Sequence, residues 1–77
     1  MTRSISSIAR DIKRVWVKPY FGAIPYLDAM LSLNTINDKY YEDDGEMIVA
    51  YFLANASTFR GNDAKILKQE LKQLLKN

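Results

Sequence analysis

Residues 47–54 read MIVAYFLA, an unbroken run of eight apolar residues near the middle of a 77-residue chain. The pattern alone is compatible with a buried strand, but Met, Ala, Phe and Leu outnumber the β-branched Ile48 and Val49,. We therefore expect a helix. Because this helix would be apolar on almost every side, the pattern predicts a central helix on which the other helices pack.

The flanking residues predict where this helix begins and ends. Asp43 or Asp44 is expected to cap its N-terminus, and Glu46 would lie in the first turn, where a carboxylate interacts favourably with the helix dipole,. The helix is expected to close around TFRG (residues 58–61), with Gly61 providing a left-handed stop,.

The N-terminal segment has the clearest helical spacing. Its apolar residues recur at intervals of three and four, at Ile5, Ile8, Ala9, Ile12, Val15 and Trp16,. Ser4 or Thr2 would cap this helix. KPYFG (residues 18–22) would close it, because the residue before a proline is pushed out of the helical region,.

A second helix is expected in GAIPYLDAMLSLN (residues 22–34), with Pro25 tolerated in the first turn and an end near Asn34,. The residues that follow mix turn formers with tyrosines, and we expect them to hold a short helical turn before a break at Gly45,.

A last helix is expected after residue 61, capped by Asn62 or Asp63, with leucines on one face and lysines on the other,. The sequence contains no repeat and no linker. It therefore predicts an all-α fold: residues 1–77 form a single domain, a compact bundle of about four helices around the central apolar helix.

Cysteine and histidine are both absent. The chain therefore lacks thiolate and imidazole metal ligands and the usual pairs of nucleophile and base. Residues 55–60 carry several polar groups but no activating base. Charged residues interrupt the N-terminal segment, so it contains no signal-peptide core and no spanning segment,. We expect a cytoplasmic, non-enzymatic protein without metal or cofactor.

The chain has a net charge of +2, with basic ends and an acidic middle. NDKYYEDDGE (residues 37–46) holds five carboxylates, yet the EF-hand pattern fails because a loop aligned on Gly45 would begin and end with tyrosine,. The simplest interpretation is a solvated helix start. The alternative is a patch that docks on a basic protein surface. Its residues would be Asp38, Tyr40, Tyr41, Glu42, Asp43, Asp44 and Glu46.

Basic residues follow the outer faces of the first and last helices. They suit a solvated surface, and Lys72 and Lys76 would also complement a helix dipole,. An alternative function is nucleic-acid binding through phosphate contacts. The residues for that function would be Arg10, Lys13, Arg14, Lys18, Lys65, Lys68 and Lys72.

VWVKPYFGAIPY (residues 15–26) contains four aromatic residues, namely Trp16, Tyr20, Phe21 and Tyr26. In so small a domain we expect most of them in the core. An exposed Tyr20 or Phe21 beside Lys18 would anchor a partner protein. Exposed aromatic residues would also suit a third function, a structural or assembly module that self-associates.

Most of the chain resembles a group of short proteins encoded in phages and prophages of Gram-positive bacteria. The resemblance runs from ARDIK (residues 9–13), through YFGAIPYLDAMLSLNTINDKYYEDDGEMIVAYFLANASTFRG (residues 20–61), to KQELKQLL (residues 68–75). It implies an accessory factor that acts in the cytoplasm of the infected bacterial host. Such factors bind and block a host defence protein or nucleoprotein complex, such as a CRISPR effector. The acidic patch would then be the docking element.

Overall fold

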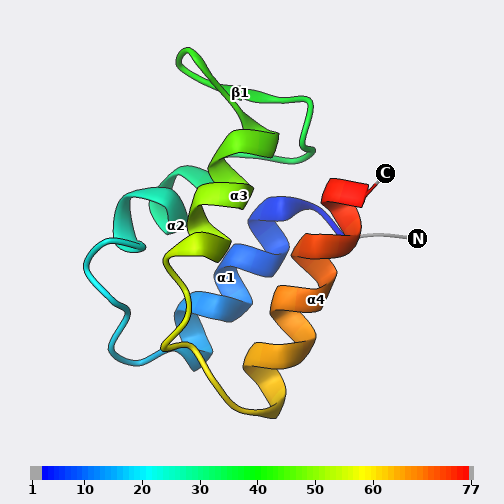
Figure 1. Cartoon of the computed structure of the whole chain (residues 1–77). Helices are drawn as coiled ribbons and strands as arrows, with labels where there is room; N and C mark the ends of the chain where they lie inside the picture. The colour runs from blue at the N-terminus through cyan, green and yellow to red at the C-terminus, as the bar shows by residue number, and fades with distance from the viewer. Residues whose placement is uncertain (1–2, 77) are drawn as a thin grey trace.

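Four helices and one small β-hairpin make up the computed structural model, which describes residues 3–76 (Figure 1). The helices are α1 (Ile5–Val15), α2 (Ile24–Met30), α3 (Gly45–Ala54) and α4 (Asn62–Lys76). The hairpin strands are β1 (Lys39–Tyr40) and β2 (Asp43–Asp44). The structure confirms a compact, mostly helical chain with four helices, but the hairpin departs from the predicted all-α fold.

Helix α1 forms where its apolar spacing predicts, and its buried face consists of Ile5, Ile8, Ala9 and Ile12. The Ser4 hydroxyl accepts a hydrogen bond from the Ser7 amide at 3.2 Å, which confirms Ser4 as the cap,. Thr2, the other expected cap, lies outside the described residues. The helix ends at Val15, where Trp16 adopts an extended backbone and its side chain enters the core.

The helices pack pairwise in a ring without a central member. Helix α1 packs on α2 and α4, and α3 also packs on α2 and α4. The prediction of a central helix is not confirmed, because α3 keeps one face in solvent: Met47 is 42% exposed and Tyr51 is 46% exposed. A continuous apolar run therefore overstated how much of this helix is buried.

The core lies inside this ring and is entirely apolar among the described residues. Phe52 and Phe59 are its largest fully buried side chains, and both contact the indole of Trp16, which is also buried. Phe59 stacks on Trp16 at 4.8 Å between ring centroids, and Phe52 meets it edge-on at 6.1 Å. These three rings join α1, α3 and the connection that precedes α4.

Helix α2 ends at Met30, earlier than the predicted end near Asn34. The next three amides each bond to the third carbonyl before them, so the chain turns away and Leu33 enters the core. The carbonyls of Leu33 and Asn34 then accept hydrogen bonds from the first amides of α1, those of Ser6 at 2.8 Å and Ile5 at 3.0 Å. Continued helix would have left those donors of α1 without these acceptors.

Helix α3 ends at Ala54, before the predicted TFRG stop, because Ala56 and Phe59 turn into the core. Gly61 does have the expected positive φ, 110°, but it serves the start of α4. Its carbonyl accepts a hydrogen bond from the Lys65 amide at 2.9 Å. Asn62 and Asp63, the predicted caps, are already the first residues of α4.

Candidate functional site

The acidic residues of the predicted patch lie in and beside the β-hairpin at one end of the molecule, where the sequence predicted a short helical turn (Figure 1). That prediction is wrong, since Lys39 pairs with Asp44 and Tyr40 pairs with Asp43 in an antiparallel register. The tight loop between the strands requires a positive φ, and Tyr41 provides it with φ 58°,. The chain therefore reverses within a few residues and projects its loop into solvent.

The tip of this hairpin is highly exposed. Tyr41 is 87% exposed, and its ring meets that of Tyr40 edge-on at 4.7 Å between centroids. Tyr40 itself is half-buried against the core. Four carboxylate residues are also exposed on or beside the hairpin, namely Glu42, Asp43, Asp44 and Glu46. We call these four residues and Tyr41 the hairpin patch.

Asp38 differs from the other acidic residues because its carboxylate binds the chain itself. It accepts hydrogen bonds from the backbone amides of Asn34 at 2.8 Å and Thr35 at 3.2 Å, and from the Thr35 hydroxyl at 3.3 Å. The two amide bonds hold the pKa of Asp38 below its usual range, and the hydroxyl adds to the effect,. Asp38 therefore orders residues 34–38 and is engaged before any partner arrives.

Replacement of Asp38 by alanine is expected to lower the melting temperature by several degrees at pH 7. The lowered pKa means that the folded state binds fewer protons than the unfolded state, so the ionised carboxylate stabilises the fold above the unfolded pKa of about 3.9,. This contribution disappears as the pH falls through the folded pKa. Melting temperatures at pH 7 and at about pH 2 compare the two regimes.

The matched control for that experiment is Asp43→Ala, because Asp43 is exposed and its carboxylate accepts no hydrogen bond from residues 3–76. This control should melt close to the wild type at both pH values. An Asp38→Ala variant that melts with the wild type at pH 7 would show that the carboxylate does not order this segment.

The base of the hairpin is fastened to α3 through the backbone. The Gly45 amide donates to the Asp38 carbonyl at 2.7 Å, and the Glu46 amide donates to the Ile36 carbonyl at 3.0 Å. Asp44 stands at the N-cap as predicted, but its side chain makes no capping bond, because these carbonyls already accept the helix's first amides,. The carboxylate of Asp44 is thereby left at the surface.

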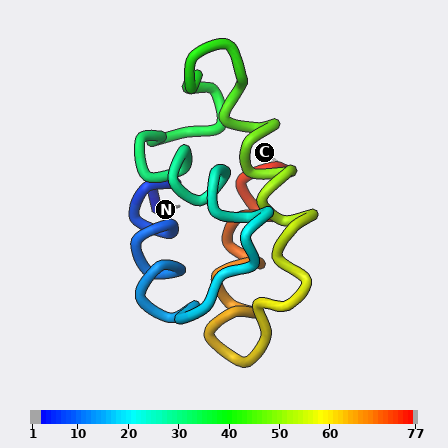
Figure 2. Tube along the Cα trace, turned by 90° about the vertical axis from the view of Figure 1, so that its left-hand side faces the viewer, coloured from blue at the N-terminus to red at the C-terminus, as the bar shows by residue number. Residues whose placement is uncertain are grey.

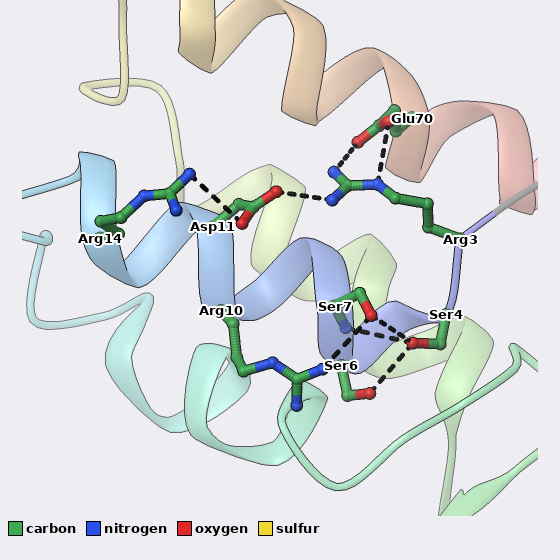
Figure 3. A network of polar contacts seen from close by, with 8 residues as sticks. All are labelled: Arg3, Ser4, Ser6, Ser7, Arg10, Asp11, Arg14 and Glu70. Atoms are coloured by element: carbon green, nitrogen blue, oxygen red, sulfur yellow. Dashed lines mark hydrogen bonds and ion pairs between the residues drawn. The ribbon is translucent and has the colours of Figure 1, made fainter.

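The predicted basic strip on α1 is partly neutralised by neighbouring carboxylates. Figure 3 shows one of these pairs, Arg14 with Asp11. Arg14 lies 3.4 Å from Asp11, and Lys13 lies 3.9 Å from Asp28. Arg10 donates to the Ser7 hydroxyl at 3.3 Å, and Lys18 is exposed beyond the helix. The structure therefore does not present this strip as one row of free charges.

Arg3 joins the first and last helices within the same network. Its guanidinium lies 2.6 Å from Asp11 of α1 and 2.6 Å from Glu70 of α4. The hydrogen bonds that Arg3 donates to Glu70 and then to Asp11 raise the pKa of Arg3, and the same bond to Asp11 lowers the pKa of that carboxyl. Arg3 therefore fastens α1 to α4, as Figure 3 shows.

The basic residues of α4 are arranged differently. Lys65, Lys68 and Lys72 line an open groove together with Arg60, which precedes the helix. Arg60 was not among the basic residues predicted to bind nucleic acid, since no helical period connects it to the lysines. Lys76, at the far end of α4, does not line this groove.

The four aromatic residues of residues 15–26 divide between core and surface. Trp16 is buried, and Tyr26 is partly buried and contacts the Tyr51 ring at 5.6 Å between centroids. Tyr20 and Phe21 are exposed by 44% and 76% and lie against each other. Trp16 and Tyr26 thus pack in or against the core, whereas both residues named as anchors in the event of exposure, Tyr20 and Phe21, are at the surface.

No protein-family model matches the sequence, and no curated protein or solved structure shows significant similarity to it. Within residues 3–76, no group of three or more acidic side chains is placed to hold a metal ion. None of the helices formed by these residues combines the length and apolar character needed to cross a bilayer.

Proposed function

We propose that the protein is a non-enzymatic binding protein whose hairpin patch docks on a basic surface of a partner protein. The observation that carries the proposal is the state of Tyr41, which is 87% exposed and has φ 58°. A left-handed backbone costs an L-residue about 1–2 kcal/mol. The exposed ring buries little surface in return, so Tyr41 contributes little to the core and suits a contact residue.

The carboxylates around Tyr41 support a basic partner. Within residues 3–76, no lysine or arginine lies within 4.0 Å of the carboxylates of Glu42, Asp43, Asp44 or Glu46. Their charges are therefore available to attract lysine and arginine side chains, which accelerates encounter and orients the complex. The tyrosine ring supplies contact area at low entropic cost.

The resemblance to phage and prophage proteins supplies the biological setting of the proposal. A basic groove that normally holds nucleic acid is the kind of surface that an acidic hairpin complements. A host defence complex such as a CRISPR effector contains such a groove. We propose that the protein inhibits it stoichiometrically by occupying the groove.

Affinity capture of the tagged protein tests the proposal. The bait is exposed to a nuclease-treated lysate of a bacterial host that carries its defence systems, and bound proteins are identified by mass spectrometry. We expect one defence protein in an amount close to that of the bait. Recovery of no specific protein would contradict the proposal.

Charge reversal then tests the docking element with the captured partner. Glu42→Lys/Asp43→Lys is expected to weaken binding by about 30-fold or more, because charges at the contact change sign. Asp28→Lys/Asp63→Lys is the matched control, since it changes the net charge equally at exposed positions outside the hairpin. Titration calorimetry measures both affinities, and equal losses in the two variants would rule out docking through the hairpin.

A further inference from the structure

The basic groove beside α4 is a second surface that the proposed docking of the hairpin does not use. It has a volume of about 410 Å³ and lies between α4 and the connection that follows α3. Figures 1 and 2 place this connection at the opposite end of the molecule from the hairpin. An anion in the groove would therefore lie far from the acidic hairpin patch.

The four basic residues of the groove have no acidic partner in the described part of the chain. Within residues 3–76, no carboxylate oxygen lies within 4.0 Å of the charged groups of Arg60, Lys65, Lys68 or Lys72. On α1, by contrast, both Lys13 and Arg14 have carboxylate neighbours. The structure therefore concentrates uncompensated positive charge in this groove.

Lys68 occupies a fixed position in the groove. Its ammonium donates to the Ala56 carbonyl at 2.8 Å and lies 5.8 Å from the centroid of the Phe59 ring. Burial lowers the pKa of Lys68, and repulsion from Lys72 and Arg60 lowers it further,. An ammonium has three N–H donors, so Lys68 retains donors for a ligand. A bound anion would also relieve the repulsion among these charges.

The spacing along α4 suits a row of phosphates. At 1.5 Å rise per residue, Lys65 and Lys72 lie about 10 Å apart along the helix axis. That length corresponds to about three nucleotides of one duplex strand. Phe59, the aromatic residue of the groove, is only 2% exposed and offers no face for stacking an unpaired base,.

We propose that this groove binds the phosphate backbone of duplex nucleic acid without reading its sequence. Arg60, Lys65 and Lys72 contact successive phosphates, and Lys68 donates from the floor of the groove. This site does not depend on the hairpin's function. It consists of Arg60 and the lysines of α4, and the basic strip of α1 is not part of it.

Fluorescence anisotropy with a labelled DNA duplex of about 20 base pairs tests the proposal over about 50–200 mM KCl. The groove variant is Arg60→Gln/Lys65→Gln/Lys72→Gln, which leaves Lys68 on its carbonyl. The matched control is Arg10→Gln/Lys13→Gln/Lys18→Gln, which removes the same charge from α1 and the segment beyond it. Circular dichroism establishes that both variants keep the helical fold.

We expect the wild type to bind the duplex with a steep salt dependence. The logarithm of the binding constant should fall with the logarithm of the salt concentration with a slope close to −0.9 for each phosphate contacted. The groove variant should lose about tenfold or more in affinity at low salt and flatten the slope by about 2 to 3. The control should stay within about twofold of the wild type. Absence of wild-type binding at about 50 mM salt, or an equal loss in the control, would overturn the proposal.

A single-stranded probe of the same length tests the duplex assignment. Because the groove offers no exposed aromatic ring, the single strand is expected to bind more weakly than the duplex,. Tighter binding of the single strand would contradict the inferred duplex specificity.

Discussion

Gly45→Ala is expected to lower the free energy of unfolding by about 1–3 kcal/mol, the range for an overpacked site. An added Cβ would lie 2.8 Å from the Thr35 carbonyl oxygen, 3.0 Å from that of Asp38 and 3.1 Å from that of Ile36. The last two carbonyls accept the first amide hydrogen bonds of α3. They cannot move away from a methyl group without weakening those bonds.

Urea unfolding followed by circular dichroism measures this loss, with Gly22→Ala as the control. A Cβ at Gly22 would come within 2.6 Å of the Tyr20 ring, which belongs to a side chain that is 44% exposed and can rotate aside. The Gly22 variant should therefore lose less stability than the Gly45 variant. Equal stability of Gly45→Ala and the wild type would show that residues 35–38 are not held against α3.

Phe52→Ala is expected to have the largest effect on the fold, a loss of about 3–5 kcal/mol. Phe52 is fully buried on α3, and its ring meets Trp16 edge-on. Removal of the ring leaves a cavity where α1, α3 and the α3–α4 connection meet. A domain of this length has a total stability of about 4–12 kcal/mol, so a large share would be lost.

The fluorescence of Trp16 reports this change directly, because it is the only tryptophan in the chain. Phe52→Leu, which keeps most of the apolar volume, should lose much less stability than Phe52→Ala. Tyr51→Ala removes a neighbouring ring that is 46% exposed and should cost less than about 1 kcal/mol,. If Phe52→Ala unfolded at the same midpoint urea concentration as the wild type, the Phe52 ring would not have the stabilising role in the core that we expect.

The sequence predicted best those elements whose signals are local. Helix α1 follows from its apolar spacing and from Ser4, whose hydroxyl bonds to an amide three residues away. The segment between α2 and α3 was predicted incorrectly because hydrogen bonds to its backbone carbonyls determine its conformation. The carbonyls of Leu33 and Asn34 accept hydrogen bonds from amides of α1, and those of Ile36 and Asp38 accept hydrogen bonds from amides of α3. Backbone carbonyls are common to all residues, so side-chain patterns do not identify these bonds.

The candidate sites show the same limit. The sequence identified the acidic residues and grouped Asp38 with the others in the alternative docking patch, whereas backbone amides separate Asp38 from the exposed hairpin patch. Arg60 was not grouped with the lysines of α4, because helical spacing does not connect it to them. It reaches the same groove only through the turn at Gly61. Both distinctions depend on how the chain folds back, which charge and periodicity do not encode.

Because the first helix, α1, packs on the last helix, α4, the arrangement of the helices does not depend on where the chain begins. Arg3 binds Glu70, and Arg3 and Leu74 line one shallow cavity, so the two ends of the described chain are neighbours (Figure 1). A circularly permuted chain could therefore join these ends through a short linker and open at another surface turn. Each helix would keep its neighbours in the ring although the order of the helices along the polypeptide had changed.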